Sequence, residues 1–364
     1  MTFSRCCKRS QKSFSGIDTQ DTHPELDEDA GGVPTIATVA RLANVSVASA
    51  SRVLNGIRTS PTTLARVTAA AEAIGYVPNA AARTLRSRRT GQIAFAMPDV
   101  GNPVYTTMIG SIQAVARARG WRLLLHSTGA DTGDELAMVR DLKHRFVDGL
   151  ILASLYLTDA HAEELRRAAA PVVVLGRPTG RTLVDTVRAY SSKGARDAVR
   201  HLHAAGCRRI AFVNGPQHTA PGSSRRRGYL DGLRAASLPR DDALIEVADD
   251  FMIEPGRRAA ECLLERATPD AILCANDLLA IGALAALRDA GLDVPGDVAL
   301  VGMDNSALSE VTWPALTSVD LGSAERARIA AELLLERIED PAREPRVVGV
   351  EPRLVVRASS GAKA

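Results

Sequence analysis

Arginine dominates the charged residues of one short segment. Between Pro34 and Thr90 the sequence has eight arginines and a single acidic residue, Glu72. The whole chain of 364 residues carries a net charge of only +3, so this positive charge is concentrated locally. A guanidinium group can pair with phosphates or form two hydrogen bonds to guanine, which favours a nucleic-acid partner. The alternative is a solvated helical segment with a chance basic bias.

Three short helices are predicted to present these arginines. Residues that can begin or end them are Thr35, Ser46, Asn55-Gly56, Ser60-Pro61 and Gly75. The apolar positions at helical spacing are Ile36, Val39, Ala40 and Ala43, and then Leu64, Val67, Ala71 and Ile74. The second helix should run from Val47 to Leu54. The first two helices are too short to bury a core alone, so the third must cover them. Residues 34–77 therefore read as a helix-turn-helix DNA-binding head.

Residues 78–90 are predicted to form a hinge helix. Pro78 prevents the third helix from continuing, and Asn79 can cap a new one. So short a helix is marginal in isolation, so we expect it to form on DNA. Leu85, flanked by arginines, suits a wedge in the minor groove. The alternative for this segment is a polar linker.

Residues 1–33 are expected to be disordered, because their charged residues are separated by few apolar ones. A regulatory tail and an extension read from an upstream start codon both fit this segment. The five cysteines show no paired spacing, which indicates a reducing compartment and neither a disulfide framework nor a metal site. No apolar run has the length of a membrane span, and no secretory signal is present. We expect a cytoplasmic protein without cofactor or membrane partner.

After Gly91, apolar runs of strand length alternate with helical stretches. The runs are Ile93–Met97, Leu123–Leu125, Gly149–Ala153, Val172–Leu175, Ile210–Val213, Ala271–Cys274 and Val298–Val301. Helical examples are Ser192–Ala205 and Asp277–Ala290. Such alternation predicts an α/β fold of two parallel sheets covered on both faces. Ligands of such sheets bind at the carboxyl ends of the strands.

Several motifs together resemble the LacI/GalR family of bacterial transcription regulators. They are TIATVARLANVSVASASRVLNG, YVPNAAARTLR, MPDVGNPVY, HLHAAGCRRIAFVNGP, CANDLLAIGALAALRDAGLDVPGDVALVGMDN and PALTSVDL. The resemblance implies that residues 91–364 form a two-subdomain, periplasmic-binding-protein-like core for effector binding and dimerisation. We place its crossings near 187–190, 316–319 and 342–346. The N-subdomain would then span about 91–187 and 318–341, and the C-subdomain about 188–316 and 345–358.

The resemblance also implies DNA-contacting positions, with the second helix in the major groove. These positions are Thr35, Ser46, Val47, Ala48, Ser49, Ser51, Arg52 and Asn55, with Asn79, Ala82, Arg83 and Leu85 in the hinge. Arg52 can bind guanine, and Val47 and Ala48 offer apolar contact, for instance to a thymine methyl group. The alternatives are a buried core position for Val47 and a phosphate contact for Arg52.

Effector-binding residues are likewise implied at strand ends. They are Asp99, Asn102, Tyr105, Arg225, Asn276, Asp277 and Asp304. Carboxylates, amides and an arginine can bind sugar hydroxyls, and the aromatic ring can stack on the sugar. Asn276 and Asp277 can instead cap the following helix. The chain departs from the family at Tyr190-Ser191, where many members carry Asp-Asn.

The sequence therefore predicts a homodimeric repressor that binds a palindromic operator in double-stranded DNA. A small-molecule effector, which we expect to be a sugar or sugar derivative, would control its affinity for DNA. The alternative is a sugar-binding protein without a regulatory role. The scattered histidines form no HExxH motif, and the chain has neither a GxSxG elbow nor a P-loop, so we expect no enzyme.

Overall fold

The computed structural model describes residues 34–77, 89–177 and 184–361. The chain divides into two compact units, Met1–Ala80 and Ala81–Ala364, and each is described by itself. The predictions for residues 1–33 and for most of the hinge, including Asn79, Ala82, Arg83 and Leu85, lie outside the described residues.

The first unit contains three helices, which are α1 (Ile36–Leu42), α2 (Val47–Leu54) and α3 (Pro61–Ala73). Each is capped by a hydroxyl oxygen that accepts a bond from the backbone three residues later. The predicted caps Thr35, Ser46 and Ser60 are thereby confirmed. Small side chains of all three helices form one core. Its fully covered members include Val39, Ala50 and Val67.

Leu64 lies outside this core, contrary to its predicted place on the buried face of the third helix. Its side chain is 50% exposed, and Ala70 and Ala71 pack against the other helices instead. Arg66, on the same helix, donates to the backbone oxygen of Asn44 and fastens α3 to the turn between α1 and α2.

The second unit contains two six-stranded sheets, which confirms the predicted α/β class. The first sheet has the order β11-β5-β4-β3-β1-β2 and is wholly parallel in its pairings. Its strands are β1 (Gln92–Met97), β2 (Arg122–Ser127), β3 (Gly149–Ala153), β4 (Val172–Leu175), β5 (Asp185–Ala189) and β11 (Val347–Val350). Its helices are α5 (Pro103–Ala118), α6 (Thr132–Asp141), α7 (Asp159–Arg166) and α13 (Ser323–Glu339).

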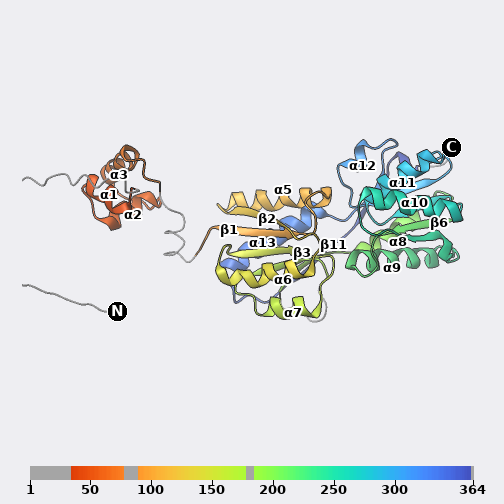
Figure 1. Ribbon diagram of the computed structural model, residues 1–364, viewed down its shortest axis with the longest axis horizontal. Helices are drawn as coiled ribbons and strands as arrows, with labels where there is room; N and C mark the ends of the chain where they lie inside the picture. The colour runs from red at the N-terminus through yellow and green to blue at the C-terminus, as the bar shows by residue number, and fades with distance from the viewer. Residues whose placement is uncertain (1–33, 78–88, 178–183, 362–364) are drawn as a thin grey trace, which may run out of the picture. The chain divides into compact units, whose positions relative to one another are not determined.

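Strand β1 shows why helices must cover both faces of this sheet. Ile93, Phe95 and Met97 pack in one cluster with residues of α5 and α13. The alternate residues Ala94 and Ala96 pack in a second cluster with residues of α6 and α7. Figure 1 shows α5 on one side of the strands and α6 and α7 on the other. A continuous apolar run thus marks a strand buried on both faces.

The second sheet has the order β12-β10-β9-β8-β6-β7, with β12 antiparallel at one edge. Its strands are β6 (Ile210–Asn214), β7 (Ile245–Val247), β8 (Ala271–Cys274), β9 (Ala299–Met303), β10 (Thr317–Asp320) and β12 (Arg353–Val355). Its helices are α8 (Ser191–Ala204), α9 (Ala220–Ala235), α10 (Ile253–Arg266), α11 (Asp277–Asp289) and the short α12 (Leu308–Val311). In Figure 1, α8 and α9 cover one face, and α10 and α11 cover the other.

The chain crosses between the sheets after β5, after β10 and after β11. The second and third crossings lie later than predicted, because β10 pairs with β9 in the second sheet and β11 pairs with β5 in the first. Residues 317–320 therefore belong to the second subdomain, and residues 347–350 belong to the first. Within the described residues, no helix is long and apolar enough to cross a membrane.

Candidate functional site

Helix α2 exposes three of the residues that were expected to contact DNA, namely Val47, Ala48 and Arg52. Val47 is 49% exposed, which excludes the core position that the sequence left open for it. Ala48 and Arg52 are exposed on the same helix, and no acidic residue occupies its first turn. An exposed arginine beside apolar side chains can enter a major groove and contact base edges there.

Ser51 differs from its neighbours on α2. Its side chain is only 2% exposed, and its hydroxyl oxygen accepts a hydrogen bond from Nδ2 of Asn55. The helical turn directs Ser51 into the core while Arg52 points outward. Because of this burial, Ser51 is not included in the operator contacts proposed below.

Four further predicted positions of the head have local bonding partners. Thr35 and Ser46 cap their helices, and Ser49 bonds to Ser46 through both its backbone nitrogen and its hydroxyl. Asn55 lies at the end of α2 and donates to the Ser51 carbonyl. Thr35, Ser46 and Asn55 are exposed, so their remaining hydrogen-bonding capacity faces solvent.

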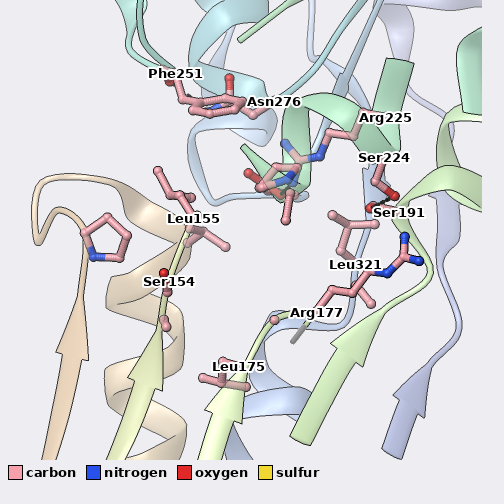
Figure 2. Close-up of a pocket in the computed structure, with 18 of the residues that line it drawn as sticks. Ser154, Leu155, Leu175, Arg177, Ser191, Ser224, Arg225, Phe251, Asn276 and Leu321 are labelled. Atoms are coloured by element: carbon pink, nitrogen blue, oxygen red, sulfur yellow. Dashed lines mark hydrogen bonds and ion pairs between the residues drawn. The ribbon is translucent and has the colours of Figure 1, made fainter. Parts of the chain in front are cut away.

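A cavity of about 710 Å³ lies in the second unit, where the carboxyl ends of both sheets meet. Residues that follow β1, β3 and β4 line it from the first sheet. Residues that follow β7, β8 and β9 line it from the second sheet. Figure 2 shows Ser154 and Leu155 facing Phe251 and Asn276 across this space. The volume suits a small organic ligand.

Six of the seven residues expected at an effector site line this cavity: Asp99, Asn102, Tyr105, Arg225, Asn276 and Asp304. Asn102 also caps α5 through its Oδ1, and Asp99 accepts a bond from the backbone of Gly101. Burial, and next the negative charge of Asp304, raises the pKa of Tyr105 far above its ordinary value. Its phenol is therefore neutral and can donate a hydrogen bond to a ligand.

Arg225 and Asp304 form a buried ion pair across the cavity wall. Nη2 of Arg225 lies 3.2 Å from Oδ1 of Asp304, and both side chains are about 9% exposed. Nη1 of Arg225 donates to the Ala275 carbonyl. Burial raises the pKa of Asp304, and the positive charges of Arg225 and Arg326 oppose that shift. Asp304 also has a backbone φ of 101°, a conformation rare outside glycine.

Asn276 and Asp277 are adjacent in sequence, but they have different surroundings. Asn276 caps α11, donates to the Phe251 carbonyl and lines the cavity. Asp277 is buried outside the cavity, where it accepts bonds from the Ser306 backbone and the Ser318 hydroxyl. Burial raises the pKa of Asp277 to about 7. Asp277 therefore does not line the cavity as expected, because its two oxygens bind the loop after β9 and strand β10.

Comparisons with known proteins decide the family. The profile of bacterial regulatory proteins of the lacI family matches residues 35–79, and that of a periplasmic binding protein-like domain matches residues 199–360. The HTH-type transcriptional regulator CelR of Thermobifida fusca is 36% identical over 90% of this chain and 98% of its own length. The chain belongs to the LacI family. It is a DNA-binding transcriptional regulator and not an enzyme, and as a bacterial regulator of transcription it is cytoplasmic.

Solved structures agree with the LacI fold. A complex of the transcriptional regulator CelR with cellobiose has a TM-score of 0.69 at 34% identity, over 90% of this chain and 99% of that one. The lac repressor dimer bound to operator and the anti-inducer ONPF has a TM-score of 0.81 over 90% of this chain and 99% of that one. Its identity to this chain is 24%, so it shows the fold alone.

In this LacI-family chain, several cavity residues were not among those predicted. They include Ser154, Arg188, Tyr190, Ser224, Phe251 and Arg326. The departure at Tyr190-Ser191 was a sequence signal for Tyr190. Arg326 lies on α13, which runs from the second sheet back to the first, and nothing in its local sequence distinguishes it from surface arginines. Phe251 follows a three-residue strand without an apolar run, so its place at a strand end was hidden.

Proposed function

We propose that this LacI-family protein represses transcription as a homodimer on a palindromic operator, and that a sugar or sugar derivative in the cavity controls its operator affinity. The main observation in support of this proposal is the cavity. It lies at the carboxyl ends of the two sheets, and six of the seven residues expected to bind an effector line it. Their carboxylate, amide and guanidinium groups match the hydroxyls of a sugar. The rings of Tyr105 and Phe251 can cover its apolar faces.

The two sheets whose strand ends line the cavity suggest how effector binding could change the affinity for DNA. A ligand that bonds to both Asp99 of the first sheet and Asn276 of the second favours the arrangement in which they are closest. Three crossings connect the sheets, so such a shift moves one subdomain against the other. We propose that the hinge around Asn79, Ala82, Arg83 and Leu85 passes this shift to the DNA-binding head, as an allosteric coupling of two sites.

For operator recognition we propose Arg52, Val47 and Ala48 as base contacts, with Thr35, Ser46, Ser49 and Asn55 as phosphate or capping positions. The exposure of Arg52, Val47 and Ala48 supports this assignment. A second copy of the head would read the other half of a palindrome, since symmetric dimers bind symmetric sites.

Exposed apolar residues on the second unit support self-association. Leu124 and Leu125 lie consecutively on β2, at an edge of the first sheet, and are 43% and 49% exposed. An edge strand with exposed leucines is a surface that proteins usually cover. We expect sedimentation of the full chain to show a dimer and the double substitution L124E/L125K to shift it toward monomer. A wild-type monomer at micromolar concentration would contradict this part of the proposal.

Fluorescence anisotropy tests the whole proposal with labelled DNA selected from a random pool. Cellobiose and other sugars are then titrated onto the complex. Tyr105→Phe should weaken the response to sugar and leave operator binding without sugar unchanged, because it removes one donor and keeps the packing. Arg52→Ala should do the reverse. A chain that binds sugar but selects no DNA would favour the alternative of a sugar-binding protein without a regulatory role.

A further inference from the structure

The cavity carries more positive charge than a neutral sugar requires. Seven basic side chains line it, against four carboxylates. The basic residues are Arg177, Arg188, Lys193, Arg196, Arg225, Arg227 and Arg326, and the acidic residues are Asp99, Asp250, Asp304 and Glu351. The lining therefore has an excess of three positive charges. A concave wall of one sign focuses the field and attracts ligands of the opposite sign.

Three of these cations already have partners. Arg225 pairs with Asp304, and Lys193 pairs with Glu351. Arg326 donates to the Leu321 carbonyl and to the Ser323 hydroxyl. The charges of Arg225 and Lys193 are balanced by these carboxylates, whereas the bonds of Arg326 to neutral groups position its guanidinium and leave its charge in place.

The other four cations, Arg177, Arg188, Arg196 and Arg227, have no carboxylate partner among the described residues. Arg188 is half-buried, and its Nε is covered without any hydrogen-bond acceptor in the described part of the chain. Nε of Arg225, a residue that is 8% exposed, is likewise covered and has no hydrogen-bond acceptor among the described residues. Covered donors without acceptors are rare in proteins and indicate a missing partner.

Three of the four unpaired arginines line the cavity from elements that meet at the start of α8. Arg188 is the penultimate residue of β5, and its guanidinium carbon lies 5.4 Å from the centre of the Tyr190 ring, a cation–π contact that positions it. Arg196 lies on α8 itself. Arg227 lies on α9 beside Gly228, where the helices touch so closely that an added Cβ would be 2.0 Å from the Ser192 carbonyl oxygen.

Hydroxyl groups and helix geometry complete this end of the cavity. Ser191 donates to Ser224 across the α8–α9 contact, drawn as a dashed line in Figure 2. No side chain caps the first turn of α8, and no acidic residue lies in it. The backbone N–H groups of that turn are therefore available to an anion in addition to the guanidinium groups.

We propose that the effector carries an anionic group, a phosphate or a carboxylate, and that this group binds between Arg188, Arg196 and Arg227 at the start of α8. This inference rests on the proposed function, because it concerns the ligand of the same cavity. The sugar hydroxyls would then face Asp99, Asn102 and Asp304, while the anion completes the bonding of the covered Nε of Arg188. Charge-assisted bonds of this type are the strong ones in proteins.

Inorganic phosphate is the minimal probe for this site. At constant ionic strength it should raise the thermal unfolding midpoint of the full chain relative to chloride, because it binds only the folded site. The rise should disappear in Arg188→Gln and Arg196→Gln. It should remain in Arg200→Gln, the matched control, since Arg200 lies on α8 but outside the cavity and pairs with Asp197. No rise, or an equal rise in all variants, would overturn the proposal.

Calorimetry with glucose, glucose 6-phosphate and glucuronate then separates the two sources of anion. If the anion is a phosphate, glucose 6-phosphate should bind at least about tenfold more tightly than glucose, and if it is a carboxylate, glucuronate should do so. In either case Arg188→Gln should remove that preference. A preference for glucose would count against the proposal. Operator binding is measured separately. An operator response to neutral sugars without any phosphate effect refutes only the anion site, whereas a phosphate effect without DNA binding refutes only the proposed regulator.

Discussion

In the DNA-binding head Arg52 is exposed on α2, whereas in the cavity Arg225 is 8% exposed and pairs with Asp304. Both arginines are placed to bind polar ligands. The charge on Arg52 faces solvent and is screened by salt, while that on Arg225 is balanced by a carboxylate 79 residues away in sequence. The head therefore presents Arg52 to solvent, whereas the cavity holds Arg225 against a buried carboxylate.

This difference has an energetic consequence. Substitutions on the exposed face of the head should change DNA binding and leave folding almost untouched. Substitution of Arg225 or Asp304 in the cavity should alter folding and binding together, because removing one charge leaves the other buried and uncompensated. The four predictions that follow test this separation, in order of decreasing expected effect.

Arg225→Ala should lower the free energy of unfolding by about 3–5 kcal/mol, because Asp304 would remain buried without its partner. Urea unfolding followed by circular dichroism measures the change. Arg234→Ala is the matched control on the same helix, where the pair with Asp231 is exposed and contributes at most about 1 kcal/mol. Equal losses in the two variants would show that the buried pair contributes no more to stability than the exposed pair.

Stability should decrease as pH rises from about 4 to about 7, because Asp277 has a pKa of about 7 in the folded chain and an ordinary value when unfolded. Below this window both states hold the proton, and within it the folded state binds more protons than the unfolded state. The loss should be on the order of 2–4 kcal/mol. Asp277→Asn should flatten the dependence, and Asp231→Asn, on the surface, should not. An unchanged slope in Asp277→Asn would assign the dependence to other groups.

Arg52→Ala should weaken operator binding by about 1–3 kcal/mol and flatten the preference at one base pair. Arg88→Ala should weaken binding to all sequences alike and reduce its dependence on salt. Anisotropy with operator and random DNA distinguishes the two. If Arg52→Ala loses affinity equally on both DNAs, then Arg52 contacts only phosphate. In either outcome the unfolding transition should stay where it is in the wild type.

Ser46→Ala should destabilise the start of α2 by about 1 kcal/mol, because it removes the oxygen that accepts from the Ser49 backbone. Amide hydrogen exchange of α2 measures this local effect. Ser46→Asp should restore the protection, since aspartate caps helices equally well. Unchanged exchange in Ser46→Ala would mean that the core around Ala50 holds the helix without its cap.

Local features of this protein could be determined from sequence alone. The caps at Thr35, Ser46 and Ser60 depend on bonds that reach only three residues along the chain, so the residues themselves specify them. The runs that became β1, β3, β4 and β8 are apolar on both faces, and such strands are visible without knowing their partners. The concentration of arginine in the head was also a property of a single contiguous segment.

Only the tertiary structure decided which side chains share a site. The polar strand β5 became recognisable through its pairing with β11, in which Val347 lies beside Thr186. The same long-range pairings moved two crossings and brought Arg188, Arg196 and Arg227 to the lining of one cavity. Asn276 and Asp277 are neighbours in the chain, yet one faces the cavity and the other binds Ser306 and Ser318. Sequence spacing fixes what lies three or four residues apart, whereas the direction of a side chain at a strand end depends on loops folded against it from distant parts of the chain.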